Sequence, residues 1–384
     1  MSKIEEMIKR LCPNGVERVR LDSLLDYEQP TRYIVNSTEY DSKYSIPVLT
    51  AGQSFILGYT NEEDGIYKAS PQNPTIIFDD FTTGFHWVDF DFKVKSSAMK
   101  MLKLKESKKE NDFRYIYMAM KTIDYIPTNH TRHWISIYSK FEIPLPPLTI
   151  QREIVSVLDS FTMLIDKMKQ EVELRKKQME YYREKLLLFD EQEADIVRIK
   201  DLFDTKNGYT PSTKNPDFWT DKGIPWVKME DIRENGTVLS DSAKHITMSA
   251  VKGSKLFNAN SIILATSATI GVHALVTVPH LSNQRFTNIY PKREYENKID
   301  MKYAYYYFFK IDRWCKEHVT LGNFAGVNMA DFYDYGFPLP SLSTQRSIVS
   351  TLDAFEQYIS KLERLITLRQ KQYAYYREKL LTFE

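Results

Sequence analysis

Two groups of side chains in this sequence have the residue types that hydrolytic chemistry uses. Asp79 and Asp80 follow the apolar run Thr75–Phe78, a place where nucleases often carry an acidic cluster. His130 and His133 are three residues apart and are close enough in sequence to act as a pair of metal ligands. No Glu-x-Lys strand follows the carboxylates, and no third ligand accompanies the histidines. The carboxylates are therefore predicted to hold a turn, and no metal site is predicted.

Motifs for nucleotides and methyl donors are incomplete. Gly253-Ser254-Lys255 lacks the upstream glycine and the strand of a phosphate-binding loop. Asn215-Pro216-Asp217-Phe218 matches the Asn-Pro-Pro-Phe motif of adenine methyltransferases only in part, because the second proline and a cofactor loop are missing. We therefore expect the chain to catalyse nothing alone, with no catalytic residue and no cofactor of its own.

The elements that would position any site are set by a repeat. Segments 144–190 and 338–384 are identical at 26 of 47 positions without a gap. Each begins with Pro-Leu-Pro, continues through Gln-Arg and ends in Tyr-Tyr-Arg-Glu-Lys-Leu-Leu. Apolar residues recur between these landmarks at steps of four and three, which predicts a coiled-coil helix of about 36 residues in each copy. The predicted seam includes Ile154, Leu158, Phe161, Ile165 and Arg175 in the first copy, and Ile348, Leu352, Phe355, Ile359 and Arg369 in the second.

The two seams are predicted to pair with each other in antiparallel orientation, because a two-fold axis then relates the tandem halves. In that register Arg175 lies near Ile359, and Arg369 lies near Ile165. Two interpretations of the arginines stay open. They are polar interruptions that fix the register, or side chains that extend past the seam into water. A rod with a module at each end would set a fixed distance between the modules.

The regions between the rods, about 13–140 and 196–335, are predicted to be modules of one fold with different recognition surfaces. They open alike, at Val19–Asp26 and Val197–Asp204, and then diverge. The N-terminal segment Ile4–Leu11 is predicted to be a helix that caps the rod or the first module. The predicted class is α+β and pseudo-two-fold symmetric, with segments at 1–143, 144–190, 191–337 and 338–384. Strands are predicted at Ser45–Leu49, Thr75–Phe78, Trp87–Lys95, Pro225–Lys228, Ser261–Ala265 and Phe286–Tyr290.

Composition excludes several classes of protein. The net charge of +1 gives no global signal for a polyanion, although a local basic groove needs none. Cys12 and Cys315 are the only cysteines, which argues against a disulfide framework or a cysteine zinc site. The N-terminus lacks the apolar core of a signal peptide, and no run reaches the roughly 20 apolar residues of a membrane span. A cytoplasmic protein without membrane contact is expected.

The ordered set of modules, rods and short motifs resembles the specificity subunit of type I restriction-modification enzymes. The resemblance covers nearly the whole chain. The motifs that carry it are Leu11–Val16, Ile46–Gly52 and Phe78–Thr82 in the first part, and Gly208–Ser212 and Ile224–Val227 in the second. It implies that each module is a target recognition domain for one half of a split DNA site, and that the helices set the spacer.

The resemblance also implies the partners. These are double-stranded DNA, two methylation subunits docked on the helices, and two motor-nuclease restriction subunits. S-adenosylmethionine, ATP and Mg²⁺ are then expected on those partner subunits. The identical Tyr-Tyr-Arg-Glu-Lys-Leu-Leu ends suit two copies of one partner; the alternative is that their identity reflects only a recent duplication and the packing of the rod. An alternative from another class is a spacer whose modules bind proteins without recognising DNA.

Because the modules differ in sequence, an asymmetric bipartite target is expected. Reading it requires polar side chains on module loops, with arginine suited to guanine and asparagine or glutamine suited to adenine. Asn283-Gln284-Arg285 could read bases, or could instead satisfy buried backbone before a strand. The predicted DNA-contact residues are Gln29, Thr31, Arg32, Thr83, Arg132 and His133 in the first module, and Lys206, Tyr209, Thr210, Ser212, Lys214, Asn323 and Asn328 in the second.

Overall fold

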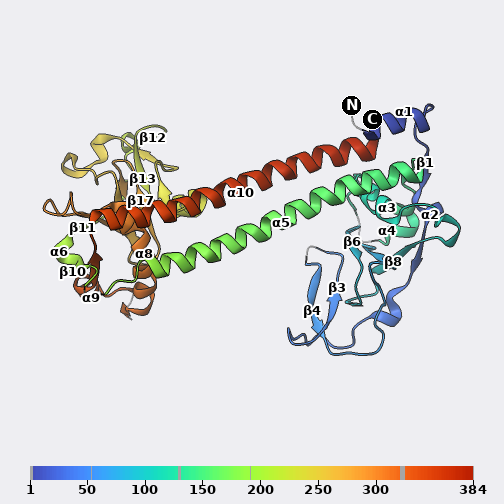
Figure 1. Ribbon diagram of the computed structural model, residues 1–384, viewed down its shortest axis with the longest axis horizontal. Coiled ribbons are helices and arrows are strands. Elements are labelled where there is room, and N and C mark those ends of the chain that lie inside the picture. The colour runs from blue at the N-terminus through green and yellow to red at the C-terminus, as the bar shows by residue number, and fades with distance from the viewer. Residues whose placement is uncertain (1–2, 53, 129–130, 191, 321–324, 384) are drawn as a thin grey trace. The chain divides into compact units, whose positions relative to one another are not determined.

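The computed structural model describes residues 3–52, 54–128, 131–190, 192–320 and 325–383 (Figure 1). The chain forms two compact units. Unit 1 contains Met1–Lys169 and Arg364–Glu384, and unit 2 contains Gln170–Glu363. Each unit therefore holds one module and a part of both long helices, α5 (Leu148–Leu186) and α10 (Leu342–Thr382). Within the described ranges, no helix is long and apolar enough to cross a membrane.

The module of unit 1 is built on a four-stranded antiparallel sheet in the order β2-β8-β5-β6, with a separate three-stranded sheet β4-β3-β7. Alternate residues of β5 point to opposite faces. Ile76 and Phe78 join the core beneath α3, whereas Ile77 joins a second core with Met101. The elements are α1 (Lys3–Leu11), β1 (Arg18–Arg20), α2 (Leu21–Leu24), β2 (Leu25–Glu28), η1 (Pro30–Tyr33), β3 (Ile46–Leu49), β4 (Ile56–Thr60), β5 (Thr75–Asp79), β6 (Phe85–Val88), β7 (Lys93–Val94), β8 (Met99–Leu104), η2 (Glu106–Lys108), α3 (Phe113–Met120), α4 (His133–Ser136), η3 (Tyr138–Lys140) and β9 (Glu142–Pro144).

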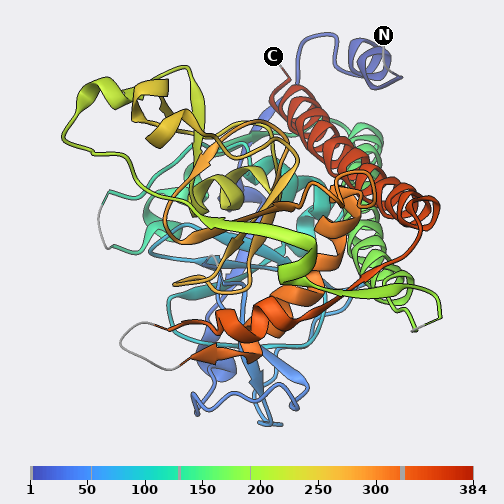
Figure 2. The same cartoon turned by 90° about the vertical axis from the view of Figure 1, so that its left-hand side faces the viewer.

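The module of unit 2 has a five-stranded sheet, β11-β19-β16-β17-β14, and a four-stranded sheet, β12-β15-β13-β18. Ile262 and Leu264 of β16 face the core that α8 covers, and Ile263 faces a second core on the other side. The strands and the orange helix α8 can be followed in Figure 2. The elements are β10 (Asp195–Arg198), α6 (Ile199–Leu202), β11 (Phe203–Asn207), η4 (Pro216–Phe218), β12 (Trp219–Thr220), β13 (Ile224–Val227), α7 (Met229–Asn235), β14 (Val238–Leu239), β15 (His245–Ile246), η5 (Met248–Ala250), η6 (Lys252–Ser254), β16 (Ser261–Ala265), β17 (His273–Val276), β18 (Leu281–Ser282), β19 (Phe286–Pro291), α8 (Met301–Glu317), β20 (Val319–Thr320), β21 (Gly326–Val327), α9 (Met329–Asp334) and β22 (Gly336–Leu339).

The shared opening of the two modules is a strand that closes each module on itself. β1 pairs antiparallel with β9, with Val19 opposite Ile143. In unit 2, β10 pairs with β22 in the same way, with Val197 opposite Phe337. The Pro-Leu-Pro landmark thus begins at the end of the closing strand, immediately before each long helix.

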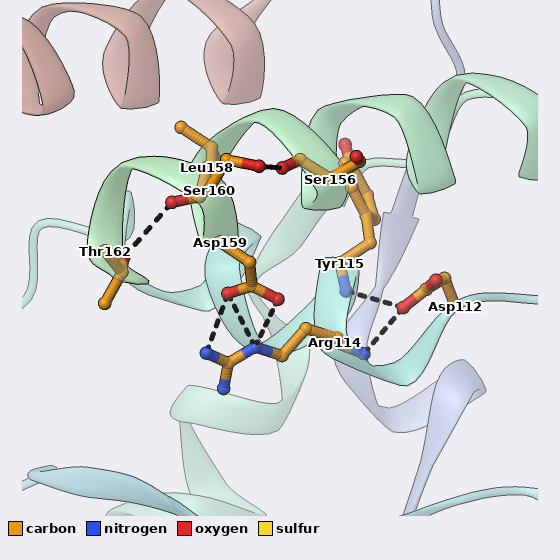
Figure 3. A network of polar contacts seen from close by, with 8 residues as sticks. All are labelled: Asp112, Arg114, Tyr115, Ser156, Leu158, Asp159, Ser160 and Thr162. Carbon is orange, nitrogen blue, oxygen red and sulfur yellow. Dashed lines mark hydrogen bonds and ion pairs between the residues drawn. The ribbon is translucent and has the colours of Figure 1, made fainter. Parts of the chain in front are cut away.

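The glutamine of the Gln-Arg landmark joins each long helix to a helix of its module. Gln151 is fully buried, accepts a hydrogen bond from Asp112 N at 2.8 Å and donates to Pro146 O at 2.7 Å. Asp112 caps α3, and Arg114 in the first turn of that helix lies 2.9 Å from Asp159 of α5 (Figure 3).

Unit 2 repeats this junction at the equivalent positions, with a lysine in place of the arginine. Gln345 accepts from Asp300 N at 2.8 Å and donates to Pro340 O at 2.8 Å. Asp300 caps α8, and Lys302 lies 2.9 Å from Asp353 of α10. A buried glutamine whose hydrogen bonds are all made fixes the direction in which each long helix leaves its module.

Within each unit the segments of α5 and α10 lie side by side and run in opposite directions (Figure 1). Phe161 stacks on Tyr376 in unit 1, with ring centroids 5.7 Å apart, and Tyr182 stacks on Phe355 in unit 2, at 5.6 Å. The antiparallel arrangement is therefore present in both units. The predicted seam residues Ile154, Leu158, Ile165, Ile348, Leu352 and Ile359 are all buried, and Phe161, Phe355, Arg175 and Arg369 are half-buried.

The seam arginines bind along their own helices. Arg175 forms an ion pair with Glu171 at 2.7 Å and donates to Gln178 at 2.7 Å, and its guanidinium lies 5.6 Å from the ring centre of Tyr358. Arg369 donates to Gln372 at 2.6 Å, the equivalent of the Gln178 contact. Both arginines are half-buried, and their charged ends bind side chains of their own helix, which favours the second of the two interpretations.

One strand prediction was wrong. The run Trp87–Lys95 is divided between β6, which ends at Val88, and β7, which begins at Lys93 and pairs in the other sheet. Asp91 interrupts the run, because it binds Lys68 and the backbone N–H of Ala69. The other five predicted runs each contain a strand, with ends shifted by at most one residue.

Candidate DNA interface

Three loops of unit 1 meet at a buried ion pair. Lys100 of β8 and Asp80, which follows β5, lie 3.1 Å apart and are almost inaccessible to water. Asp80 accepts from Trp134 N through its side chain and from His133 N through its carbonyl, both at 2.8 Å. Lys100 also donates to Gln29 Oε1 at 3.0 Å. The pair thereby ties together the loop at Gln29, the loop after β5 and the start of α4.

The predicted contact residues of unit 1 divide by exposure. Gln29, Thr31, Arg32 and Arg132 are exposed, and Arg132 stands directly before α4. Two other predicted residues are buried. Thr83 is 7% exposed with a left-handed backbone (φ 57°), and His133 is 1% exposed with Nδ1 2.9 Å from the hydroxyl of Tyr125. A buried side chain does not reach a DNA base in this conformation, so these two residues shape the loops.

Two loops of unit 2 are brought together by backbone hydrogen bonds. Tyr209 N, after β11, donates to Ser282 O at 2.8 Å. Gly208 has no room for a side chain, because a Cβ atom there would lie 2.2 Å from Ser282 O. Thr210 Oγ1 donates to Gln284 Oε1 at 2.6 Å across the same junction. Thr210 and Gln284 are both exposed, so the two loops form one polar surface.

The remaining predicted residues of this loop have different environments. Lys206, Ser212 and Lys214 are exposed. Tyr209 is half-buried, and its hydroxyl accepts from Lys252 N at 2.7 Å while the Lys252 ammonium lies 4.6 Å from its ring centre. Tyr209 therefore holds the loop against the segment around Lys252.

In the segment Asn283-Gln284-Arg285, the asparagine and the next two residues have different environments. Asn283 Oδ1 accepts from Arg285 N at 3.0 Å, so the asparagine satisfies local backbone. Gln284 and Arg285 are exposed beside Thr210, which makes them available for recognition.

A further loop lies next to this segment. Thr266 N donates to Arg285 O, and Thr266 O accepts from Val327 N at 3.0 Å. Asn328, the next residue, caps α9 by accepting from Ala330 N and donates to Asp331 at 2.6 Å. Helix capping is thus a structural role for the Asn328 side chain. Asn323 lies outside the described residues.

Buried polar groups support the loops of unit 2 from below. Asn288 of β19 donates to Lys206 O at 3.1 Å and to Ser282 Oγ at 2.8 Å, and its Oδ1 lies 3.1 Å from His280 Nε2. Burial lowers the pKa of His280 to about 4. The ring is therefore neutral at physiological pH and acts as a hydrogen-bonding group.

The carboxylates that follow β5 hold a turn. Asp79 Oδ1 accepts from the backbone N–H groups of Phe81 and Thr82, each at 2.8 Å, and Asp80 is paired with Lys100. His130 lies outside the described residues. Over the part of the chain that the structure describes, no group of three His, Cys, Asp or Glu side chains is placed to hold a metal ion.

Sequence reasoning missed the role of Lys100. Its signal was present, because alternation along β8 places Lys100 on the same face as Leu102, which is buried. A lysine at an inward strand position needs a buried partner, and Asp80 was the available carboxylate.

The paired helices expose apolar side chains at equivalent positions. Leu174 of α5 and its copy Leu368 of α10 are 62% and 55% exposed. Tyr181 and its copy Tyr375 are both 60% exposed. The two copies of the repeat thus present the same two apolar side chains to solvent.

Comparisons with known proteins find type I restriction specificity proteins similar to this chain along its whole length. The family model for the type I restriction modification DNA specificity domain matches residues 13–174 and 191–370. The specificity subunit of the type I restriction enzyme EcoR124I/EcoR124II of Escherichia coli is 40% identical over 406 aligned residues, which cover 100% of this chain and 98% of that protein. A putative type I restriction enzyme specificity subunit of Haemophilus influenzae is 27% identical over 361 aligned residues, which cover 86% of this chain and 86% of that protein.

A solved structure shares the fold. The S subunit of a type I restriction-modification system from M. genitalium superposes with a TM-score of 0.58 at 15% identity, over 96% of this chain and 97% of that one. The comparisons give no support to the alternative of a protein-binding spacer. The chain belongs to the type I restriction-modification DNA specificity family, and it is the subunit that recognises the DNA sequence.

Proposed function

We propose that each unit reads one half of an asymmetric bipartite DNA site. The observation that carries this proposal is that both units repeat the same strand pairing and the same glutamine junction, yet present different exposed side chains on their loops. Two modules that share a backbone framework but expose different loop side chains are expected to bind two different half-sites.

We assign to DNA the exposed members of the predicted set, together with two further exposed residues, Gln284 and Arg285. In unit 1 the proposed contacts are Gln29, Thr31, Arg32 and Arg132, and in unit 2 they are Lys206, Thr210, Ser212, Lys214, Gln284 and Arg285. Arginine and glutamine offer bidentate contacts to guanine and adenine, whereas lysine, serine and threonine suit phosphates. Thr83, His133, Tyr209 and Asn328 are assigned to holding the loops, and Asn323 stays a predicted contact.

The catalytic steps are assigned to partner subunits. We propose that two methylation subunits dock on the repeated surfaces around Leu174–Tyr181 and Leu368–Tyr375, and that two restriction subunits complete the complex. S-adenosylmethionine, ATP and Mg²⁺ then act on those subunits. We propose that the assembly acts in the cytoplasm, where it meets the host DNA.

The test is a pair of arginine variants in the complex with the methylation subunit. Arg132→Ala should relax base preference in one half-site, and Arg285→Ala should relax it in the other. Each lost bidentate contact should lower the free energy of discrimination against a wrong base by roughly 1–3 kcal/mol. Arg152→Ala, an exposed arginine on α5, is the control and should leave both half-sites unchanged.

Sequencing of the methylated sites measures the preference in each half separately. If both variants alter the same half-site, or if neither alters any base, the assignment of one unit to each half is wrong.

A further inference from the structure

The duplication gives each unit the same groove, where the last turns of one long helix meet the first turns of the other. In unit 1 the groove is formed by the end of α10 and the start of α5, and in unit 2 by the end of α5 and the start of α10. The equivalent pairs are Lys379 and Lys185, Leu380 and Leu186, Thr382 and Leu188, Phe383 and Phe189, Ile150 and Thr344, Glu153 and Ser347, and Ile154 and Ile348.

The groove of unit 1 is filled by α1. Ile4 is 4% exposed and belongs to the core that includes Leu380, Ile150 and Ile154. Met7 and Ile8, at helical spacing from Ile4, pack against the same core.

Two ion pairs hold α1 at its edges. Lys3 lies 2.9 Å from Glu153 of α5, and Glu5 lies 2.6 Å from Lys379 of α10. An amphipathic helix with a carboxylate in its first turn is thus what this groove binds.

The groove of unit 2 is open. It has a volume of about 690 Å³ and is lined by Leu186 at the end of α5, by Leu188 and Phe189 just after that helix, and by Ile348 of α10, with Glu193 also at the groove. Leu186 is half-buried, whereas its copy Leu380 beneath α1 is 5% exposed. Leu188 is 73% exposed.

A lysine and a carboxylate, Lys185 and Glu193, both line this groove. Lys185 is the copy of Lys379, the lysine that pairs with Glu5 in unit 1. Within the described ranges of the chain, no ion pair involves Lys185. Unit 2 therefore presents the apolar floor and the cation of a helix-binding groove without the helix.

We propose that the groove of unit 2 binds an amphipathic helix of another protein. That helix carries the apolar spacing of α1 and, in its first turn, a carboxylate for Lys185. The chain's own α1 is a poorer match, because Ser347 replaces Glu153 and leaves no carboxylate for Lys3. The assignment goes beyond DNA recognition and uses none of the proposed DNA contacts.

The test uses the intact chain and a labelled, acetylated peptide with the sequence Ser2–Leu11 carrying Lys3→Ser. Saturable binding is expected, because the substitution removes the lysine that has no partner in this groove. Lys185→Glu should weaken binding about 3- to 10-fold, on the scale of an exposed ion pair replaced by a repulsion. Leu188→Asp should abolish it.

Two controls locate the peptide. On the Lys379→Glu chain, where the ion pair of Glu5 in unit 1 is lost, peptide binding should still depend on Lys185. A peptide that also carries Glu5→Lys should regain binding on the Lys185→Glu chain, and this rescue separates pairing from misfolding.

Three results would overturn the proposal. They are no binding to the intact chain, binding that depends on Lys379 instead of Lys185, and dimerisation of the chain alone that Lys185→Glu prevents. The last result would assign the groove to the α1 helix of a second copy.

Discussion

Buried polar side chains determine where the exposed loop residues lie in each unit. In unit 1 the Asp80–Lys100 pair positions the loops around Gln29 and Arg132. In unit 2 Asn288 does so through Lys206 O and Ser282. Removing one partner of a buried pair leaves an unsatisfied polar group or charge, which costs more than the contact itself contributes. We therefore expect recognition to be as sensitive to these supports as to the exposed residues.

His280 gives unit 2 a specific dependence on pH. Its pKa in the folded chain is lowered by burial to about 4, against an ordinary value of 6.5. The contribution of the neutral His280 ring to the free energy of unfolding is fully present above pH 6.5. It is lost as the pH falls toward 4, because the unfolded chain takes up a proton that the folded chain excludes. The loss of unfolding free energy amounts to about 3–4 kcal/mol, from roughly 1.4 kcal/mol for each unit of pKa difference.

Chemical denaturation of the wild type and of His280→Gln at a series of pH values measures this contribution. The difference between their unfolding free energies should change between pH 6.5 and 4 and stay constant above pH 7. A constant difference across the whole range would mean that His280 is not held neutral in the fold.

At the scale of elements, the glutamine junctions should be the most sensitive points of the long helices. Gln151→Ala removes an acceptor for Asp112 N and a donor to Pro146 O, both in a buried site. We expect a loss of about 2–4 kcal/mol of unfolding free energy from the unsatisfied groups. Denaturation monitored by circular dichroism measures it.

The neighbouring arginine supplies the control for that experiment. Arg152 is exposed, and Arg152→Ala should change the unfolding free energy by less than about 0.5 kcal/mol. Gln345→Ala should reproduce the effect of Gln151→Ala in unit 2. Similar small losses from all three variants would contradict the assigned role of the glutamines.

The long helices and their pairing could be predicted from sequence, because a heptad pattern with a second copy leaves few other arrangements. Strand positions followed from short apolar runs, except where Asp91 divided one run between two sheets through contacts distant in sequence. The site was harder to predict. The exposure of Arg132 and the burial of His133, adjacent in sequence, depend on Asp80, more than 50 residues away. A helix cap such as Asn328 and a base reader have the same residue type, so sequence does not separate them.

At the scale of the whole molecule, half of the chain should be able to rebuild the pairing with a second copy. In a fragment 1–190, Phe161 would stack on Tyr182 of the partner copy, because Tyr182 is the equivalent of Tyr376. The fragment should form a two-fold dimer that reads a palindromic split site. Sedimentation gives the mass, and a well-folded, strictly monomeric fragment would contradict the pairing.

The length of the helices should set the spacing of the half-sites. A heptad inserted in both α5 and α10 adds about 10.5 Å, and a base pair rises about 3.4 Å. The tolerated spacer should therefore lengthen by up to about three base pairs, with both half-site sequences unchanged. Binding to DNA series that differ only in spacer length measures this. A changed half-site sequence would show that the helices do more than separate the readers.

The most direct test of the account is single-molecule methylation sequencing of host DNA, with the methylation subunit expressed and this chain present or absent. We predict a split, asymmetric motif that is methylated only when the chain is present. An unchanged methylation pattern, with the methylation subunit shown to be active, would contradict the central claim that this chain selects the DNA site.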